Sequence, residues 1–193
     1  TFKAAAHVCP SEKFTDVDTT QWYHEGIDYV LNNGLMIGTG TTTFSPNTAT
    51  TRGMIVTILY RLEGEPAVTG GNAFDDFADG EGYTDAVNWA AANEIVNGYG
   101  DGSFGPTDAI TREQMAAILY RYSAYKGYDV TARADLSGYT DAGEISSYAV
   151  EAMKWVNAEG LITGMTDTTL VPRGNAVRAQ VATILMRFCE NVA

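Results

Sequence analysis

A narrow stripe of apolar residues occurs three times along the chain, each time with the spacing of an amphipathic helix. Within a stripe the apolar positions fall at i, i+3, i+4 and i+7, which places them on one face of an α-helix. The second and third stripes follow the preceding one after 60 and 66 residues. No narrow stripe can bury itself alone, so we expect the three helices to pack together about a pseudo-threefold axis. The stripes are Ile55, Ile58, Leu59 and Leu62; Met115, Ile118, Leu119 and Tyr122; and Val181, Ile184, Leu185 and Phe188.

A second apolar stripe precedes each of these helices and predicts a first helix in every copy. Its positions fall at i, i+4, i+7 and i+8, again one helical face. A glycine-containing loop separates the two helices of a copy, and the alternation typical of strands is scarce. The first-helix stripes are Tyr23, Ile27, Val30 and Leu31; Tyr83, Val87, Ala90 and Ala91; and Ala149, Met153, Val156 and Asn157, the poorest of the three.

These patterns predict a mainly α fold. We expect three helix-loop-helix repeats arranged as a pseudo-threefold trimer around a central bundle of second helices. Turn-rich linkers separate the repeats. The predicted segments are an N-terminal arm (1–13), repeat 1 (14–64), a linker (65–73), repeat 2 (74–126), a second linker (127–138) and repeat 3 (139–190).

Composition narrows the functional classes. Of the 193 residues, 45% are hydrophobic and 19% are charged, which is typical of a globular protein rather than a disordered one. The net charge of −12 disfavours binding to nucleic acids and to anionic membrane surfaces. No apolar run approaches the ~20 residues of a spanning helix. No basic and apolar leader opens the chain, so we expect any signal peptide to have been removed or never present.

Catalytic and cofactor motifs are missing from the sequence. It has no Gly-x-Ser-x-Gly, no His-Glu-x-x-His and no phosphate-binding P-loop, and acidic stretches such as 75–81 do not supply the series of an EF-hand. Two cysteines and two histidines without a Cys-x-x-Cys pair give little basis for metal or redox chemistry. We therefore predict no enzymatic activity, no cofactor and no metal.

The order of motifs within each copy is the most specific feature. Copy two starts with Phe74-Asp-Asp76, continues through the loop Asn97-Gly-Tyr-Gly-Asp-Gly-Ser-Phe104, and enters its second helix with Ile110-Thr-Arg-Glu-Gln114. That helix contains Ile118-Leu-Tyr-Arg121. This order resembles the surface-layer homology (SLH) domain family, and three tandem copies cover nearly the whole chain.

The resemblance implies a fold, a location and a function. It implies a three-pronged helical module at the extracellular cell wall or S-layer, fused to other domains of a larger surface protein. Its partner would be a secondary cell-wall polysaccharide, pyruvylated or otherwise anionic, bound without covalent attachment in grooves between repeats. The alternative is a structural or protein-interaction module that kept the scaffold and lost most of its sugar sites.

The copies depart from the family signature Thr-Arg-Ala-Glu in different ways. The signature positions read Thr51-Arg-Gly-Met54, Thr111-Arg-Glu-Gln114 and Val177-Arg-Ala-Gln180. A Thr with Gln three residues later is a capping box, so copy two has the best-capped second helix. Met54 cannot complete such a box and Val177 cannot cap, which predicts weaker helix starts in copies one and three.

An arginine occupies the first helical position in all three copies. A positive charge there opposes the helix dipole, so its recurrence needs another reason. One interpretation is a ligand carboxylate held by the guanidinium together with unpaired backbone N–H groups. The other is an internal pair with the aspartate of the Phe-x-Asp start. A second arginine triplet, Arg61, Arg121 and Arg187, lies near helix C-termini, where we expect a structural role.

Aromatic residues open each first helix. Trp22, Tyr83 and Tyr148 could stack on sugars, but Tyr83 also fits the core stripe, so we expect these rings to be buried and Tyr99 of the copy-two loop to be exposed. We expect each groove to combine a second-helix N-terminus, its own glycine loop and the Phe-x-Asp start of the next copy. The candidate ligand-binding residues are Arg112, Gly98, Tyr99, Asp101, Gly102, Ser103, Arg52, Arg178, Asp16, Asp76, Asp141 and Trp22.

The two cysteines lie just outside the repeats, at opposite ends of the chain. A closed threefold arrangement would bring Cys9 before copy one close to Cys189 after the last helical stripe. An exported wall protein meets conditions that permit a disulfide. We therefore predict a Cys9–Cys189 disulfide, with two thiols in a terminal region as the alternative.

Overall fold

The computed structural model describes residues 9–193, and within them the fold is helical. It contains no strand, only isolated β-bridges, which confirms the mainly α prediction. No helix in this range is long and apolar enough to cross a membrane. The α-helices are α1 (His24–Asn32), α2 (Arg52–Leu62), α3 (Thr84–Ala92), α4 (Arg112–Lys126), α5 (Val150–Ala158) and α6 (Arg178–Asn191), and the short 3₁₀ helices are η1 (Pro10–Lys13), η2 (Ala142–Glu144) and η3 (Ser147–Ala149).

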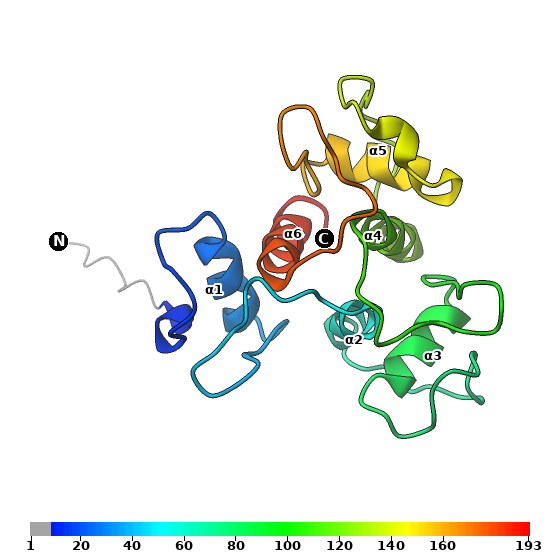
Figure 1. The fold of residues 1–193 in the computed structure, drawn as a ribbon. Coiled ribbons are helices and arrows are strands. Elements are labelled where there is room, and N and C mark those ends of the chain that lie inside the picture. The colour runs from blue at the N-terminus through cyan, green and yellow to red at the C-terminus, as the bar shows by residue number, and fades with distance from the viewer. Residues whose placement is uncertain (1–8) are drawn as a thin grey trace.

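The second helices surround a common centre and the first helices lie outside them (Figure 1). The contacts between helices show an unexpected connectivity. Helix α2 packs against α3, α4 against α5, and α6 against α1. Each outer pair therefore joins the second helix of one repeat to the first helix of the next. The last pair closes the ring, because it joins the end of the chain to its beginning.

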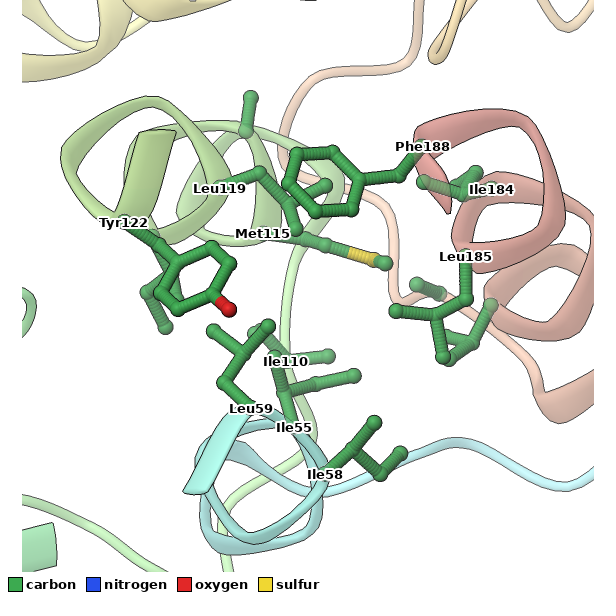
Figure 2. Close-up of a cluster of buried hydrophobic side chains, with 14 of the residues drawn as sticks. Ile55, Ile58, Leu59, Ile110, Met115, Leu119, Tyr122, Ile184, Leu185 and Phe188 are labelled. Atoms are coloured by element: carbon green, nitrogen blue, oxygen red, sulfur yellow. The ribbon is translucent and has the colours of Figure 1, made fainter. Parts of the chain in front are cut away.

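The core lies among the three central helices. Figure 2 shows the predicted stripe side chains of α2, α4 and α6 pointing toward one another. Ile55, Leu59, Met115 and Leu119 have no exposed surface. Burying a side chain of this size is worth about 1.5–3 kcal/mol, so this shared cluster is the main reason that the three helices associate. Of the predicted second-helix stripes, Leu62 alone is exposed, because it lies in the last turn of α2.

A ring of backbone hydrogen bonds connects the segments that lead into the central helices. The N–H of Thr50 donates to the carbonyl of Ala176, Ala176 donates to Ile110, and Ile110 donates to Thr50, each at 2.9 Å. These residues occupy the same position in their repeats. The three bonds form a closed cycle, so the repeats are tied together by the backbone as well as by the apolar core.

The helix starts differ as the signature predicts. The hydroxyl of Thr111 accepts from the Gln114 N–H at 3.3 Å, and the Gln114 amide oxygen accepts from the Thr111 N–H at 3.0 Å, which completes a capping box. In repeat 1, Thr51 caps α2 but Met54 returns no bond. In repeat 3 the reverse holds, because Gln180 bonds back at 3.1 Å to Val177, whose side chain has no acceptor.

The predicted disulfide is wrong in this structure, although the ring closes as expected. Cys9 and Cys189 are not bonded to each other. The Cys9 thiol lies by Asp28 of α1, whereas Cys189 of α6 interacts with the hydroxyl of Tyr29. Asp28 and Tyr29 are successive residues of α1, so their side chains point about 100° apart. The two cysteines therefore lie against different faces of this helix.

The predicted N-terminal arm packs against the body of the molecule where it is described. Helix η1 contacts α1, and Ser11 is completely buried. The backbone N–H of Ser11 donates to the Asp28 carboxylate at 3.0 Å. The rest of the predicted arm, residues 1–8, lies outside the described residues. The predicted repeat and linker boundaries stay predictions.

Candidate functional site

Three grooves lie at the junctions between repeats. Each groove contains residues from all three repeats. A groove is floored by the glycine loop and second helix of one repeat and edged by the residue two positions before the first helix of the next repeat. The remaining repeat supplies its signature arginine. Groove 1 (about 480 Å³) includes 35–39, Met54, Arg61, Gly82 and Arg178; groove 2 (about 370 Å³) includes 96–99, Gln114, Arg121, Tyr148 and Arg52; groove 3 (about 280 Å³) includes 161–165, Gln180, Arg187, Trp22 and Arg112.

The signature arginines reach across to a neighbouring repeat, not to their own loop. The Nε–H of Arg52 donates to the Phe104 carbonyl at 2.8 Å, and an Nη2–H donates to the Asn97 carbonyl at 3.3 Å. Arg112 makes the same pair of bonds to the loop of repeat 3, and Arg178 to the loop of repeat 1. The expectation that Arg112 shares a groove with Gly98 and its loop is therefore wrong. The arginine of that groove is Arg52.

The backbone N–H groups at these helix starts are not available to a ligand. The N–H of Arg112 donates to the Gly174 carbonyl and the N–H of Glu113 to the Pro172 carbonyl, both at 2.9 Å. The equivalent groups of α2 and α6 are paired in the same way with the next loop in the ring. The predicted anion site built from unpaired N–H groups is therefore wrong, because the ring of repeats satisfies them internally. Any anion must be bound by side chains.

The aspartates of the three Phe-x-Asp starts hold the loops and do not face the grooves. The Asp76 carboxylate accepts from the Phe104 N–H at 2.9 Å and from the Gly105 N–H at 2.7 Å. Asp16 and Asp141 bind the N–H groups at the equivalent loop positions of their own repeats. The hydrogen bond from the Leu170 N–H stabilises the charged carboxylate and lowers the pKa of Asp141. These carboxylates accept from backbone N–H groups, so they anchor the loops, and their predicted contact with a ligand stays a prediction.

The signature arginines are buried and form no close ion pair with a carboxylate of residues 9–193. Arg52 and Arg112 are each 5% exposed and Arg178 is 7% exposed. None takes part in an ion pair within residues 9–193, so the internal salt bridges considered from the sequence are not formed. Burial lowers the pKa of each guanidinium, but arginine stays charged in proteins. Asp76, Asp141 and Asp16 attract these guanidinium groups only from beyond ion-pair distance. Burying a charge is costly, and an anion in the groove would add a closer counter-charge.

Exposed aromatic rings line grooves 2 and 3, whereas groove 1 includes the half-buried ring of Tyr83. Trp22 is 62% exposed in groove 3 and Tyr148 is 52% exposed in groove 2, so the expected burial of these rings is wrong, whereas Tyr83 is half-buried. Their equivalent in groove 1 is Gly82, which has no side chain. Tyr99 is exposed, as predicted, and its ring lies 4.7 Å from the Arg52 guanidinium.

The buried carboxylate of Glu113 contacts the hydroxyl of Tyr148 and the residue before η3. The Glu113 carboxylate accepts from the Ser146 N–H at 2.9 Å and its hydroxyl at 2.7 Å. The Tyr148 hydroxyl lies 3.4 Å from the same carboxylate. Burial and the Glu113 charge raise the pKa of Tyr148 to about 12, so its hydroxyl stays protonated. Repeats 1 and 3 have Gly53 and Ala179 at the Glu113 position, so this support is special to groove 2.

Asp101, Gly102 and Ser103 shape the copy-two loop and do not line groove 2. The Asp101 carboxylate accepts from the N–H of Ser103 at 2.9 Å and from its hydroxyl at 2.6 Å, which makes a self-contained turn. Gly102 lies within the turn, between Asp101 and Ser103, and has a φ of 93°, a region that favours glycine. Gly98 does line groove 2, and a Cβ there would clash with the Phe74 ring at 2.6 Å.

The second arginine triplet lines the grooves, and the structural role expected from the sequence stays a prediction. Arg61, Arg121 and Arg187 each line a groove, one to each. Arg61 is exposed and lies 3.6 Å from Glu65, and Arg187 donates to the Gly160 carbonyl at 3.3 Å. Arg121 is half-buried and makes no hydrogen bond or ion pair with another described residue. The clue in the sequence was the constant nine-residue spacing between the two triplets.

The fold and grooves define a class of protein, a closed three-repeat helical module with a composite groove at each junction. The S-layer homology domain model matches the chain at residues 13–53, 73–116 and 138–182. The chain therefore belongs to the S-layer homology domain family, with three tandem copies.

Individual relatives agree with this assignment. The chain is 32% identical to an endoglucanase of Bacillus sp. (strain KSM-635) over 187 residues, which is 93% of this chain and 19% of the relative. It is 26% identical to the surface-layer 125 kDa protein of Lysinibacillus sphaericus over 98% of this chain and 16% of that protein. A cellulosome-anchoring protein of Acetivibrio thermocellus is 31% identical over 51% of this chain and 22% of its own length. The chain thus spans less than a quarter of each of these proteins.

Proposed function

We propose that the three grooves bind an anionic cell-wall polysaccharide and that the module thereby attaches a larger surface protein to the wall without a covalent bond. Family membership makes this chain a cell-wall anchoring module of the cell surface. The enzymes among its relatives match over a small share of their length, 19% for the endoglucanase and 9% for an amylopullulanase of Thermoanaerobacterium thermosulfurigenes. Their names therefore give this module no catalytic role of its own.

One observation carries the proposal of an anionic ligand. Every groove is lined by two arginines, one of which is a buried guanidinium that forms no close ion pair among residues 9–193. The whole chain carries a net charge of −12, so these cations are local exceptions in an acidic protein. A carboxylate on a sugar, such as a pyruvate ketal, would pair with them by charged hydrogen bonds. Local charge also explains how an acidic protein can bind an acidic polymer.

Groove 2 offers the most complete set of sugar-binding groups. Tyr148 and Tyr99 present aromatic faces, Gln114 presents an amide, and Arg52 and Arg121 present guanidinium groups. Apolar faces of sugars pack on aromatic rings, while amide and guanidinium groups bond the hydroxyl and carboxylate oxygens. We propose that groove 2 contributes most of the affinity and groove 3, with Trp22, contributes next.

Groove 1 has a different chemistry, which favours a second candidate function there. Met54 stands where groove 2 has Gln114, Thr39 where it has Tyr99, and Gly82 where it has Tyr148. Ile37 and Met54 are 70% and 45% exposed at or near its edge. An exposed apolar surface of this kind suits a protein segment better than a sugar, so groove 1 is the candidate site for protein interaction.

The test is sedimentation of the module with purified cell walls, before and after extraction of the polymers that are not peptidoglycan. We expect binding before extraction and its loss afterwards. Arg121→Ala should weaken binding to intact walls, while Arg173→Ala is the matched control, since Arg173 is exposed and lines none of the three grooves. Undiminished binding to extracted walls would contradict the proposed ligand and identify peptidoglycan instead.

The carboxylate is tested separately. Chemical removal of pyruvate from the isolated polymer should reduce its affinity for the wild-type module to that of Arg121→Ala. The two losses should not add when both changes are combined, because they remove the two sides of one interaction. Full additivity would show that Arg121 does not contact the pyruvate carboxylate.

A further inference from the structure

We propose that Cys9, His24 and Asp28 form a transition-metal site, with Zn²⁺ as the favoured ion, where the N-terminal 3₁₀ helix η1 meets α1. One ligand atom from each side chain lies within 4.8 Å of the other two. The site is separate from the three grooves, since none of these residues lines them.

The local geometry already brings two of the ligands to one face of a helix. His24 and Asp28 are four residues apart on α1, a spacing that places their side chains one turn above the other. The Nε2 atom of His24 and the Oδ2 atom of Asp28 are 3.0 Å apart. A histidine with another ligand at i+4 is a frequent arrangement at zinc sites. Cys9 precedes η1 and supplies the third ligand from the opposite side.

Buried polar atoms at this position point to a bound ion. The Oδ1 atom of Asp28 accepts from the Ser11 N–H at 3.0 Å, which leaves Oδ2 for another partner. Asp28 is 4% exposed, and its Oδ2 and the Nε2 of His24 are contacted by no hydrogen-bonding group outside the cluster of Cys9, His24 and Asp28. The buried hydroxyl of Ser11 is unsatisfied as well. Such atoms are rare inside proteins, and a cation coordinated by Oδ2 and Nε2 would satisfy two of them.

The donor set selects the kind of metal. A thiolate, an imidazole and a carboxylate together suit Zn²⁺, whereas Ca²⁺ and Mg²⁺ require oxygen ligands. Three protein ligands leave one tetrahedral position for water or another donor.

The consequence would be a clip between η1 and α1. Without a metal ion, η1 is held to α1 by the Ser11 hydrogen bond and by packing. The bound ion would fasten the segment that enters the module to the outer helix of repeat 1. Since α1 also pairs with α6, the clip would be attached at the junction that closes the ring.

The experiment is titration of the reduced full-length chain with Co²⁺, followed by displacement with Zn²⁺. Tetrahedral Co²⁺ bound to a thiolate gives visible d–d bands and a sulfur-to-metal charge-transfer band in the near ultraviolet. We expect one equivalent to bind and Zn²⁺ to abolish the bands. Excess Ca²⁺ should leave them unchanged. Cys9→Ser should remove the charge-transfer band, and His24→Gln should weaken binding more than about tenfold, since even outer-shell changes cost that much.

Matched variants decide which residues bind the ion. Cys189→Ser removes the other cysteine, and His7→Ala removes the other histidine, which lies outside the described residues; both should bind Co²⁺ like the wild type. Circular dichroism of each metal-free variant checks that the fold is intact. The proposal is overturned if the reduced wild type gives no charge-transfer band. It is equally overturned if the band survives Cys9→Ser, or is lost in Cys189→Ser or His7→Ala.

Discussion

Two arginines of groove 2 should have separable roles, and substituting each one with alanine tests this. Arg52 is buried and donates to two loop carbonyls, whereas Arg121 is half-buried and makes no hydrogen bond or ion pair with another described residue. We therefore expect Arg52→Ala to destabilise the fold. Arg121→Ala should weaken polysaccharide binding and leave stability almost unchanged.

The magnitudes follow from the contacts. Arg52→Ala removes the bonds to Phe104 and Asn97 and the guanidinium contacts with the rings of Tyr99 and Phe104. Each acceptor left unsatisfied costs about 1–3 kcal/mol, so we expect a loss of about 3 kcal/mol in the free energy of unfolding. For a chain of this size that corresponds to roughly 6–12 °C in Tm. For Arg121→Ala, loss of one charged hydrogen bond to the ligand is worth about 1.5–3 kcal/mol, or about tenfold and more in Kd.

Differential scanning calorimetry measures the stability, and isothermal titration with the extracted polysaccharide measures the affinity. Arg173→Ala serves as the control for the loss of one positive charge. Arg112→Ala adds a second comparison, because its side chain reaches groove 3 and should leave groove 2 intact. The two roles are not separate if Arg121→Ala binds as tightly as the control, or if Arg52→Ala melts at the wild-type temperature.

Three further predictions concern the loops, the caps and the ring. The hydrogen bond from the Leu170 N–H lowers the pKa of Asp141. The ionised Asp141 carboxylate therefore stabilises the fold fully above the ordinary aspartate pKa of about 4, and this stabilisation is lost as the pH falls through the lowered pKa. Asp141→Asn should flatten the acid side of the curve of Tm against pH. Met54→Gln should complete the capping box begun by Thr51 and stabilise the protein by about 0.5–1 kcal/mol in chemical denaturation, whereas an unchanged midpoint would contradict this. Truncation to residues 1–126 should abolish cooperative unfolding, because it removes α6, the partner of α1; a sharp melting transition would refute that dependence.

Much of the fold was predictable because repetition and helical periodicity are local properties. The stripes of Ile55, Met115 and Val181 identify the central helices directly, and their threefold recurrence indicates a shared core. The pairing of outer helices was not predictable in this way. A loop of glycines allows a first helix to pack on its own second helix or on a neighbour, and only tertiary contacts such as those between α2 and α3 decide between the two.

The candidate site was predicted in its residue types but not in its assembly. The sequence identifies Arg52, Arg112 and Gly98 as recurring positions, yet it cannot show that an arginine crosses to the next repeat in the ring. The Phe-x-Asp aspartates bind backbone N–H groups of their own loops, and the sequence alone does not distinguish such a contact from one with a ligand. The Cys9 cluster was missed because its members are separated in sequence and do not recur.

Because each groove contains residues from all three repeats, a complete signature in one repeat does not by itself give a complete groove. Repeat 2 has the most complete signature, but its arginine serves groove 3, and groove 2 takes Arg52 from repeat 1 and Tyr148 from repeat 3. Repeat 1 shows the reverse, because its own groove lacks a ring at Gly82 while it supplies Trp22 to groove 3. A repeat whose own groove loses affinity is therefore still needed by both of the others. This interdependence explains why eroded signature positions in copies one and three do not by themselves indicate lost grooves.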